Sequence, residues 1–249
     1  MMTTPKAVLA SLPGWENATW RELDGCITNR PWLIEADGRR AVLKIDPVPR
    51  AEPFNSRRQE AQIQTVAAKA ELAADVLYVS DTVLVTEFVE GVVWSLDCLD
   101  DNANLEKLAA ALKKLHSLPL TGRTFDPVAA AREYARLIDP EKAARVSECL
   151  RKIEAGPRPP HLCCCHNDLV VANIVNTPSV RFLDWEYARD NDPFFDLATI
   201  VAHHKLTGEQ SDHLLDAYFD GDGSRWREQL ARQMDVYEAL LWLWSAARP

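Results

Sequence analysis

Residues 166–173 read His-Asn-Asp-Leu-Val-Val-Ala-Asn, and residues 182–184 read Phe-Leu-Asp. Apolar segments border the first stretch and predict short strands that enclose a polar loop. The pattern supplies two carboxylates, Asp168 and Asp184, and an amide, Asn173. Phosphoryl transfer from ATP uses this set, because one Asp orients and deprotonates the attacking hydroxyl while an Asn and a second Asp bind magnesium on the phosphates. We therefore predict Asp168 as the catalytic base, with Asn173 and Asp184 as Mg²⁺ ligands.

An upstream strand and helix add to this pattern. Residues 41–45 read Ala-Val-Leu-Lys-Ile, a short strand that carries Lys44. Ser56 and Gln59 form a capping box that opens an Ala-rich helix, on whose apolar side Glu60 lies. In kinase-type sites such a Lys binds the α- and β-phosphates and pairs with a Glu on the next helix. We predict this role for Lys44 and Glu60. The alternative is a surface ion pair, which would contribute little to stability.

A further strand is predicted over residues 82–88, and Val89-Glu90-Gly91 ends it. This is where a two-lobed kinase has the hinge whose backbone hydrogen-bonds the adenine. We therefore assign Glu87, Phe88 and Val89 to ATP binding. A Lys, a Glu, a hinge, an Asp with an Asn and a further Asp in this order are stronger evidence than any one of them alone.

Four further segments carry a resemblance to a known family: Thr28-Asn29, residues 112–118 (Leu-Lys-Lys-Leu-His-Ser-Leu), residues 184–188 (Asp-Trp-Glu-Tyr-Ala) and residues 192–198 (Asp-Pro-Phe-Phe-Asp-Leu-Ala). From about Leu23 to Trp244 the chain resembles the aminoglycoside phosphotransferase and choline/ethanolamine kinase superfamily. Within it, the chain looks most like bacterial choline-kinase-like and thiamine-kinase-like members.

This resemblance implies a two-lobed, protein-kinase-like α+β fold. The N-terminal lobe would hold a small antiparallel sheet and one main helix, and the C-terminal lobe would be larger and mostly helical. It implies ATP and Mg²⁺ as cofactors, with Thr28 and Asn29 in the nucleotide loop. That loop has one glycine, Gly25, where the family usually has a pair, so another nucleotide or a modest ATP affinity stays open.

The chain divides by these signals into residues 1–88 as the nucleotide-binding lobe, 89–91 as the hinge and 92–249 as the helical lobe with the acceptor site. Helical patterns are predicted from residue 57 to about 74 and over residues 102–117, 127–137, 141–154, 193–206, 208–219 and 224–247.

The short spacing after Asp184 limits the size of the acceptor. Seven residues separate it from Asp192-Pro193, where Asp at the N-cap and Pro at the first turn predict a helix start. A protein kinase needs a long activation segment in this interval, so we expect a small-molecule acceptor.

Aromatic residues suggest the chemistry of that acceptor, since aromatic faces with a nearby carboxylate bind a quaternary ammonium. We predict Trp185, Tyr237 and Trp244 as acceptor contacts and Glu186 as the carboxylate. For each Trp the alternative is a core position, and for Glu186 it is a surface salt bridge. His166 and Asp196 are expected to brace the catalytic loop by hydrogen bonds.

Composition argues against a nucleic-acid-binding protein and against a membrane-spanning helix. The chain has 249 residues, 37 acidic against 28 basic, and a net charge of −9. It has no basic stripe for nucleic acid and no apolar run of the ~18 residues that a membrane helix needs. Six cysteines suit a reducing cytoplasm. We interpret residues 163–165, three of these cysteines in a row, as a buried strand rather than a zinc site, because neighbouring side chains on a strand point to opposite faces.

The predicted function is an ATP- and Mg²⁺-dependent kinase that acts on the hydroxyl of a small, cationic alcohol of the choline, ethanolamine or thiamine type, as a cytoplasmic monomer or homodimer. An aminoglycoside or sugar kinase is the rival enzyme. A nucleotide-binding regulator without turnover is the rival from another class. A metal hydrolase built on His166 and Asp168 lacks the further His ligands it would need.

Overall fold

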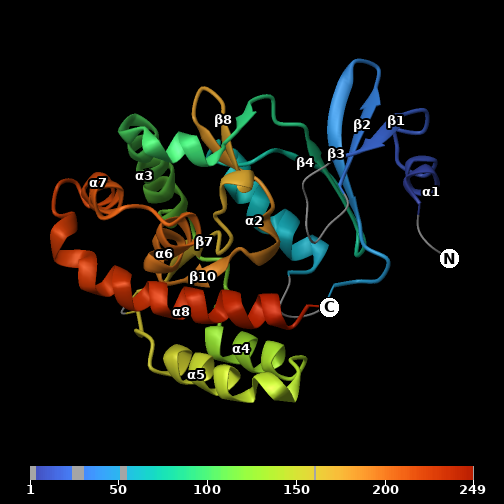
Figure 1. Ribbon diagram of the computed structural model, residues 1–249. Coiled ribbons are helices and arrows are strands. Elements are labelled where there is room, and N and C mark those ends of the chain that lie inside the picture. Colours follow the sequence, from blue (N-terminus) through green and yellow to red (C-terminus); the bar gives the residue numbers. More distant parts are fainter. Residues whose placement is uncertain (1–3, 24–30, 51–54, 160, 249) are drawn as a thin grey trace. The chain divides into compact units, whose positions relative to one another are not determined.

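The computed structural model describes residues 4–23, 31–50, 55–159 and 161–248. Two compact units make up the chain: Met1–Val92 with Arg181–Tyr187, and Val93–Val180 with Ala188–Pro249 (Figure 1). The division differs from the predicted boundaries at Val92 and at residues 181–187. Residues 181–187, which we had placed in the C-terminal lobe, belong to the first unit and bring Asp184 into it.

The first unit is built on a five-stranded antiparallel sheet in the order β1-β2-β3-β5-β4. Its strands are β1 (Thr19–Glu22), β2 (Trp32–Ala36), β3 (Arg39–Ile45), β4 (Val76–Val79) and β5 (Val83–Glu87). Asp37 and Gly38 both have positive φ, as the tight turn between β2 and β3 requires. Helix α1 (Pro5–Leu9) supplies Leu9 to the apolar core under this sheet, where Ile34 and Leu43 are also buried.

Helix α2 (Arg57–Lys69) packs against β4 and β5. The predicted capping box is present: the Ser56 hydroxyl accepts from the Gln59 N–H, and the Gln59 side chain accepts from the Ser56 N–H. The helix ends before the predicted residue 74. Glu71 takes a left-handed conformation there, and the Leu72 N–H returns to the carbonyl of Ala67, which closes the helix as a glycine would.

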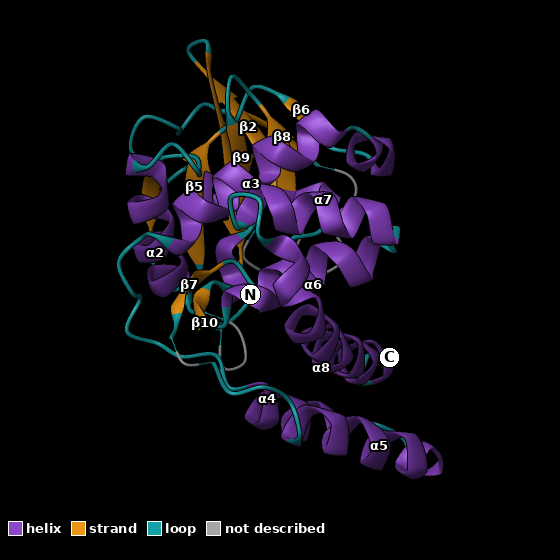
Figure 2. Ribbon diagram, turned by 90° about the vertical axis from the view of Figure 1, so that its left-hand side faces the viewer, coloured by secondary structure: helices purple, strands orange, loops and turns teal. Residues whose placement is uncertain are grey.

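The second unit is mostly helical. The helices and 3₁₀ turns of this unit are η1 (Leu96–Asp100), α3 (Asn102–His116), α4 (Pro127–Ala135), η2 (Pro140–Lys142), α5 (Ala143–Glu154), η3 (Val171–Asn173), α6 (Pro193–His204), α7 (Gly208–Tyr218), η5 (Gly223–Trp226) and α8 (Arg227–Ala246). Helix α8 runs along α4, α5 and α6, and α3 packs on α7 (Figures 1 and 2). None of the helices in the described ranges is both long and apolar enough to cross a membrane.

Short strands carry the loops of interest. β7 (Cys163–Cys165) pairs antiparallel with β10 (Arg189–Asn191), and a small sheet has the order β6-β8-β9. The strands of that sheet are β6 (Val92–Val93), β8 (Ile174–Asn176) and β9 (Val180–Phe182). Asp168 lies in the loop between β7 and η3, and Asp184 lies between β9 and the 3₁₀ turn η4 (Trp185–Tyr187). The predicted start of α6 is confirmed, because the Asp192 carboxylate accepts from the Phe194 N–H and Pro193 occupies the first turn.

Candidate active site

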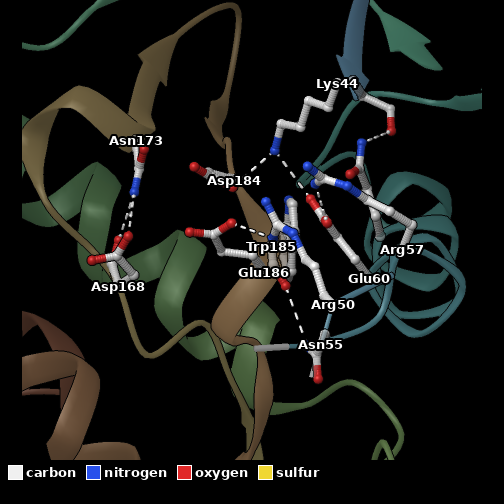
Figure 3. A network of polar contacts seen from close by, with 12 residues as sticks. Lys44, Arg50, Asn55, Arg57, Glu60, Asp168, Asn173, Asp184, Trp185 and Glu186 are labelled. Atoms are coloured by element: carbon white, nitrogen blue, oxygen red, sulfur yellow. Dashed lines mark hydrogen bonds and ion pairs between the residues drawn. The ribbon is translucent and has the colours of Figure 1, made fainter. Parts of the chain in front are cut away.

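In the first unit, Lys44 of β3 lies between two carboxylates (Figure 3). Its ammonium donates to Glu60 Oε1 at 3.0 Å and to Asp184 Oδ1 at 2.8 Å. The antiparallel register sets Lys44 opposite Leu84 of β5, and the capped helix α2 carries Glu60 with its side chain fully buried. The structure thus brings Lys44 and Glu60 together as predicted, and it adds Asp184 to the pair.

Electrostatics keep Lys44 and Asp184 charged. Burial alone would lower the pKa of Lys44, but the charges of Asp184 and Glu60 outweigh it and hold that pKa well above its usual value. Burial alone would raise the pKa of Asp184, and the Lys44 charge together with its hydrogen bond lowers it below the usual value. The set therefore presents a permanent ammonium and a permanent carboxylate.

A buried arginine that the sequence analysis missed holds Glu60 in place. Arg57 donates to both oxygens of Asp46 at 2.6 and 2.9 Å and to Glu60 Oε2 at 2.7 Å. Each oxygen of Glu60 therefore has its own cation, Lys44 on one and Arg57 on the other. The available signals were Asp46 two residues after Lys44 and Arg57 three residues before Glu60, on the same side of one helix.

Two residues predicted to contact the acceptor are already engaged within the first unit. Arg50 pairs with Glu186 and also donates to Asp46 at 3.0 Å. Trp185 is fully buried, and its indole N–H donates to the carbonyl of Phe182 at 3.1 Å. Glu186 is thus the partner of Arg50, and Trp185 is a core residue with no ring face exposed. Their acceptor roles stay predictions that these contacts do not support.

In the second unit, Asn173 orients Asp168. Its amide nitrogen donates to the Asp168 carbonyl at 2.9 Å and to Asp168 Oδ2 at 3.0 Å (Figure 3). The Val170 N–H donates to the same carbonyl at 3.0 Å. The carboxylate is thereby fixed on its own loop, and the carbonyl oxygen of Asn173 is the atom of that amide left over from these bonds.

Asp196 of α6 binds the start of this loop. Its carboxylate accepts from the backbone N–H groups of His166 at 2.9 Å and Asn167 at 2.7 Å, and it contacts His116 Nε2 at 3.1 Å. Asn167 has a positive φ and also accepts from the Asn191 side chain at 2.8 Å. Asp196 therefore braces the loop by hydrogen bonds, as predicted. His166 contributes its backbone N–H to this contact.

The other two predicted acceptor contacts come from α8. Tyr237 is buried, and its hydroxyl shares a 2.8 Å hydrogen bond with His203 Nδ1. Burial raises the pKa of Tyr237 well above its usual value, and the charge of Asp168 adds to the shift, which puts the phenol within electrostatic reach of that carboxylate. Trp244 is half-buried and carries the guanidinium of Arg248 over its ring, 3.4 Å from the centroid.

Two of the three residues assigned to ATP binding before and at the hinge use their backbone N–H groups within the protein. The Glu87 N–H donates to the Asp75 carbonyl at 2.9 Å, and the Phe88 N–H donates to the Arg40 carbonyl at 3.3 Å. These two donors are not available to a base while those bonds last, so Val89 has the N–H to consider. Thr28 and Asn29, assigned to the nucleotide loop, lie outside the described residues.

Comparisons with known proteins identify the family of the chain. Residues 19–237 match the phosphotransferase enzyme family. Protein LicA of Haemophilus influenzae is 30% identical over 207 residues, which are 78% of this chain and 61% of that protein. Thiamine kinase of Salmonella typhi is 31% identical over 192 residues, 75% of this chain and 66% of the kinase. The chain thus spans about two thirds or less of these relatives' lengths.

A solved structure has the same fold. The choline/ethanolamine kinase family protein from Mesorhizobium loti superimposes with a TM-score of 0.74 at 25% identity, over 96% of this chain and 83% of that one. The predicted kinase-like α+β class is therefore confirmed, and so is the resemblance drawn from the motifs. Because the family match covers most of the sequence, the chain belongs to the phosphotransferase enzyme family.

Proposed function

We propose that this protein transfers the γ-phosphoryl group of ATP to the hydroxyl of a small, cationic alcohol. The observation that carries the proposal is the Lys44 ammonium, which is bonded to both Glu60 and Asp184. In phosphotransferases of this fold class a lysine so held binds nucleotide phosphates. Family membership supports the reaction class, and the relatives' names suggest choline, ethanolamine and thiamine as acceptors to test.

The nucleotide would be bound by the first unit. Lys44 would neutralise the α- and β-phosphates, with Glu60 and Arg57 fixing its position. Arg57 donates to the other oxygen of Glu60 and so would keep that carboxylate in place when Lys44 binds the phosphates. The Val89 backbone would bind the adenine, and Thr28 and Asn29 would belong to the phosphate loop.

Magnesium fits the donor set. Mg²⁺ prefers carboxylate and carbonyl oxygens. The amide nitrogen of Asn173 is used on Asp168, so its carbonyl oxygen remains for a metal, and the Lys44 contact uses one oxygen of Asp184 and leaves the other. We assign the ion to Asn173 and Asp184. When bound, it would offset the negative charge on the phosphates.

Asp168 would act on the acceptor hydroxyl. In a loose transition state the base mainly orients the nucleophile and takes its proton late. The two hydrogen bonds from Asn173 restrain the Asp168 carboxylate, so the base would be oriented before the acceptor binds.

The acceptor would contact α8. Tyr237 lies within the electrostatic field of Asp168, and the Trp244 ring already takes one cation, the Arg248 guanidinium. An acceptor ammonium would replace Arg248 on that ring, because cation–π binding favours the aromatic face. With these contacts a cationic acceptor could bind without any contact to Glu186 or Trp185.

The test is ADP release with a panel of choline, ethanolamine, thiamine, aminoglycosides and amino sugars. For the acceptor that turns over, Asp168→Asn should lower kcat at least ~100-fold and leave the KM for ATP nearly unchanged, as loss of a positioned base does. The matched control is Asp81→Asn, which removes an exposed carboxylate of the first unit and should keep full activity.

Three outcomes of this test would overturn parts of the proposal. Turnover that survives Asp168→Asn overturns the mechanism. Turnover only with aminoglycosides or amino sugars overturns the proposed acceptor class. Stabilisation by Mg-ATP in a thermal-shift assay, with no ADP release on any member of the panel, overturns the kinase assignment in favour of a nucleotide-binding regulator.

A further inference from the structure

Two cysteines and a histidine of the second unit form a cluster that the proposed reaction does not use. The ligand atoms of His116, Cys163 and Cys165 all lie within 4.8 Å of one another. His116 ends α3, and both cysteines belong to β7, which packs against α3 (Figures 1 and 2). Alternate residues of a strand share a face, so Cys163 and Cys165 point together while Cys164 points away.

The spacing of these atoms fits a thiophilic metal. Tetrahedral zinc with bonds of about 2.3 Å to two thiolates places the sulfurs about 3.8 Å apart. The Cys163 and Cys165 sulfurs are 3.5 Å apart. A small outward shift of one side chain would therefore admit the ion, with no rearrangement of the strand.

The surroundings of His116 are those of a metal-binding histidine. Such residues commonly donate one ring N–H to a carboxylate and bind the metal with the other nitrogen. His116 Nε2 lies 3.1 Å from Asp196 Oδ2, and Nδ1 shares a 2.7 Å hydrogen bond with the Tyr218 hydroxyl. Nδ1 is thus the nitrogen that would bind, once the Tyr218 contact opens.

The cluster lies in a negative environment. The Cys165 thiol points at the backbone carbonyls of Asn191 and Asp192, 3.6 Å from each. Asp192 is 2% exposed, and its Oδ2 has no hydrogen-bond partner among the described residues. A bound cation would compensate this buried acceptor-rich region.

We propose that His116, Cys163 and Cys165 bind one soft divalent cation, Zn²⁺ or its analogue Cd²⁺. Two metal–sulfur bonds and one metal–nitrogen bond form, and the two thiol protons leave to solvent. Water completes the coordination. Cys163 is partly exposed and gives the ion its entry path, whereas Cys165 is fully buried.

The site would couple metal supply to the catalytic loop. Asp196, which contacts His116, also holds the backbone N–H groups of His166 and Asn167, immediately before Asp168. Metal bound to His116 would strengthen its hydrogen bond to Asp196, because a coordinated imidazole is a better donor. The binding claim itself does not depend on the reaction proposed above.

The experiment titrates the full chain with Cd²⁺ in a phosphine reductant and follows the thiolate-to-cadmium ultraviolet absorption. Competition with a chromophoric chelator then gives the Zn²⁺ affinity. A Cys98→Ala background removes a partly exposed thiol outside the cluster. We expect one equivalent of metal per chain and a higher Tm with metal present.

Variants separate the site from the other thiols. Cys163→Ala, Cys165→Ala and His116→Gln should each weaken Zn²⁺ binding at least ~10-fold, the scale on which ligand and supporting groups act. Cys164→Ala is the matched control, since it removes a buried thiol from the same strand but from the opposite face, and it should leave affinity unchanged.

Two results would overturn the proposal: absence of the cadmium–thiolate band in the starting protein, or equal losses of affinity in Cys164→Ala and Cys163→Ala. Should Cys165→Ala fail to fold because that position is buried, Cys163→Ala and His116→Gln decide the matter. Cys163 is partly exposed, and His116 is less buried as a residue than Cys165.

Discussion

The two units bury polar groups in different ways. The first unit pairs charged side chains with one another: Asp46, Arg57, Glu60 and Lys44 form one chain of ion pairs that ends at Asp184. The second unit instead uses a carboxylate to bind backbone. Asp196 accepts from the N–H groups at the start of the loop that carries Asp168, and Asp190 does the same for Thr121 and Gly122.

The difference has an energetic consequence. Removing one member of a buried ion pair leaves the other charge without a partner, which costs more than the pair itself contributed. Removing a side-chain acceptor from a backbone N–H costs the desolvation of a neutral group. Damage in the first unit should therefore appear mainly as lost stability, whereas damage at the loop of the second should appear mainly as lost geometry near Asp168.

The largest effect is expected from Arg57→Met. The substitution keeps much of the side-chain volume but removes the cation from one oxygen of Asp46 and one of Glu60, while Arg50 and Lys44 still pair with the other oxygens. The free energy of unfolding should therefore fall by about 3 kcal/mol, the low end for a broken buried ion pair. Chemical denaturation monitored by circular dichroism measures it. Arg58→Met is the control on the next residue of α2. Its partner is Asp81, and because both side chains are more than half exposed we expect a loss below about 1 kcal/mol. Equal losses of stability in the two variants would contradict the expected difference between a buried and an exposed ion pair.

A smaller loss of stability, with a larger loss of turnover, is expected from Asp196→Asn. The amide can accept only on one side, so one of the His166 and Asn167 N–H groups loses its acceptor, at a cost of about 1–3 kcal/mol. Denaturation and steady-state kinetics on the same samples measure both effects.

Asp190→Asn is the matched variant for that comparison, because Asp190 also accepts from two consecutive backbone N–H groups, at 2.7 and 2.9 Å. It should lose similar stability and keep more turnover than Asp196→Asn. If both variants lose turnover equally, the bracing of the loop by Asp196 has no special part in the reaction.

Local signals let the sequence predict most of the helices. The capping box at Ser56 and Gln59 and the Asp192-Pro193 start of α6 depend on neighbouring residues only, and both are present. The end of α2 was predicted too late because Glu71, a residue with no glycine-like signal, adopts the left-handed turn.

The side-chain partners were harder to predict. Arg50 and Glu186 are 136 residues apart, and their pairing depends on tertiary folding that no local pattern encodes. The same holds for His116, which meets the cysteines of β7 through the packing of α3. A contiguous reading of residues 163–166 could not find that cluster, since it joins alternate strand residues to a distant helix.

The last effect appears only at acid pH and concerns a histidine that the second unit keeps neutral. Burial lowers the pKa of His204 to about 4, with His203 adding to the shift. Between pH 6.5 and 4 the unfolded chain binds a proton that the folded chain does not, so stability should fall as the pH falls through this window and level off below it. The loss from this group should be about 2 kcal/mol, less than the full shift implies because the side chain is partly exposed. Denaturation midpoints measured from pH 7 to pH 4 provide the test, and the difference between the starting protein and His204→Gln isolates this histidine from the carboxylates that also titrate. A difference that stays constant with pH would mean that His204 takes up its proton in the folded chain as readily as in the unfolded one.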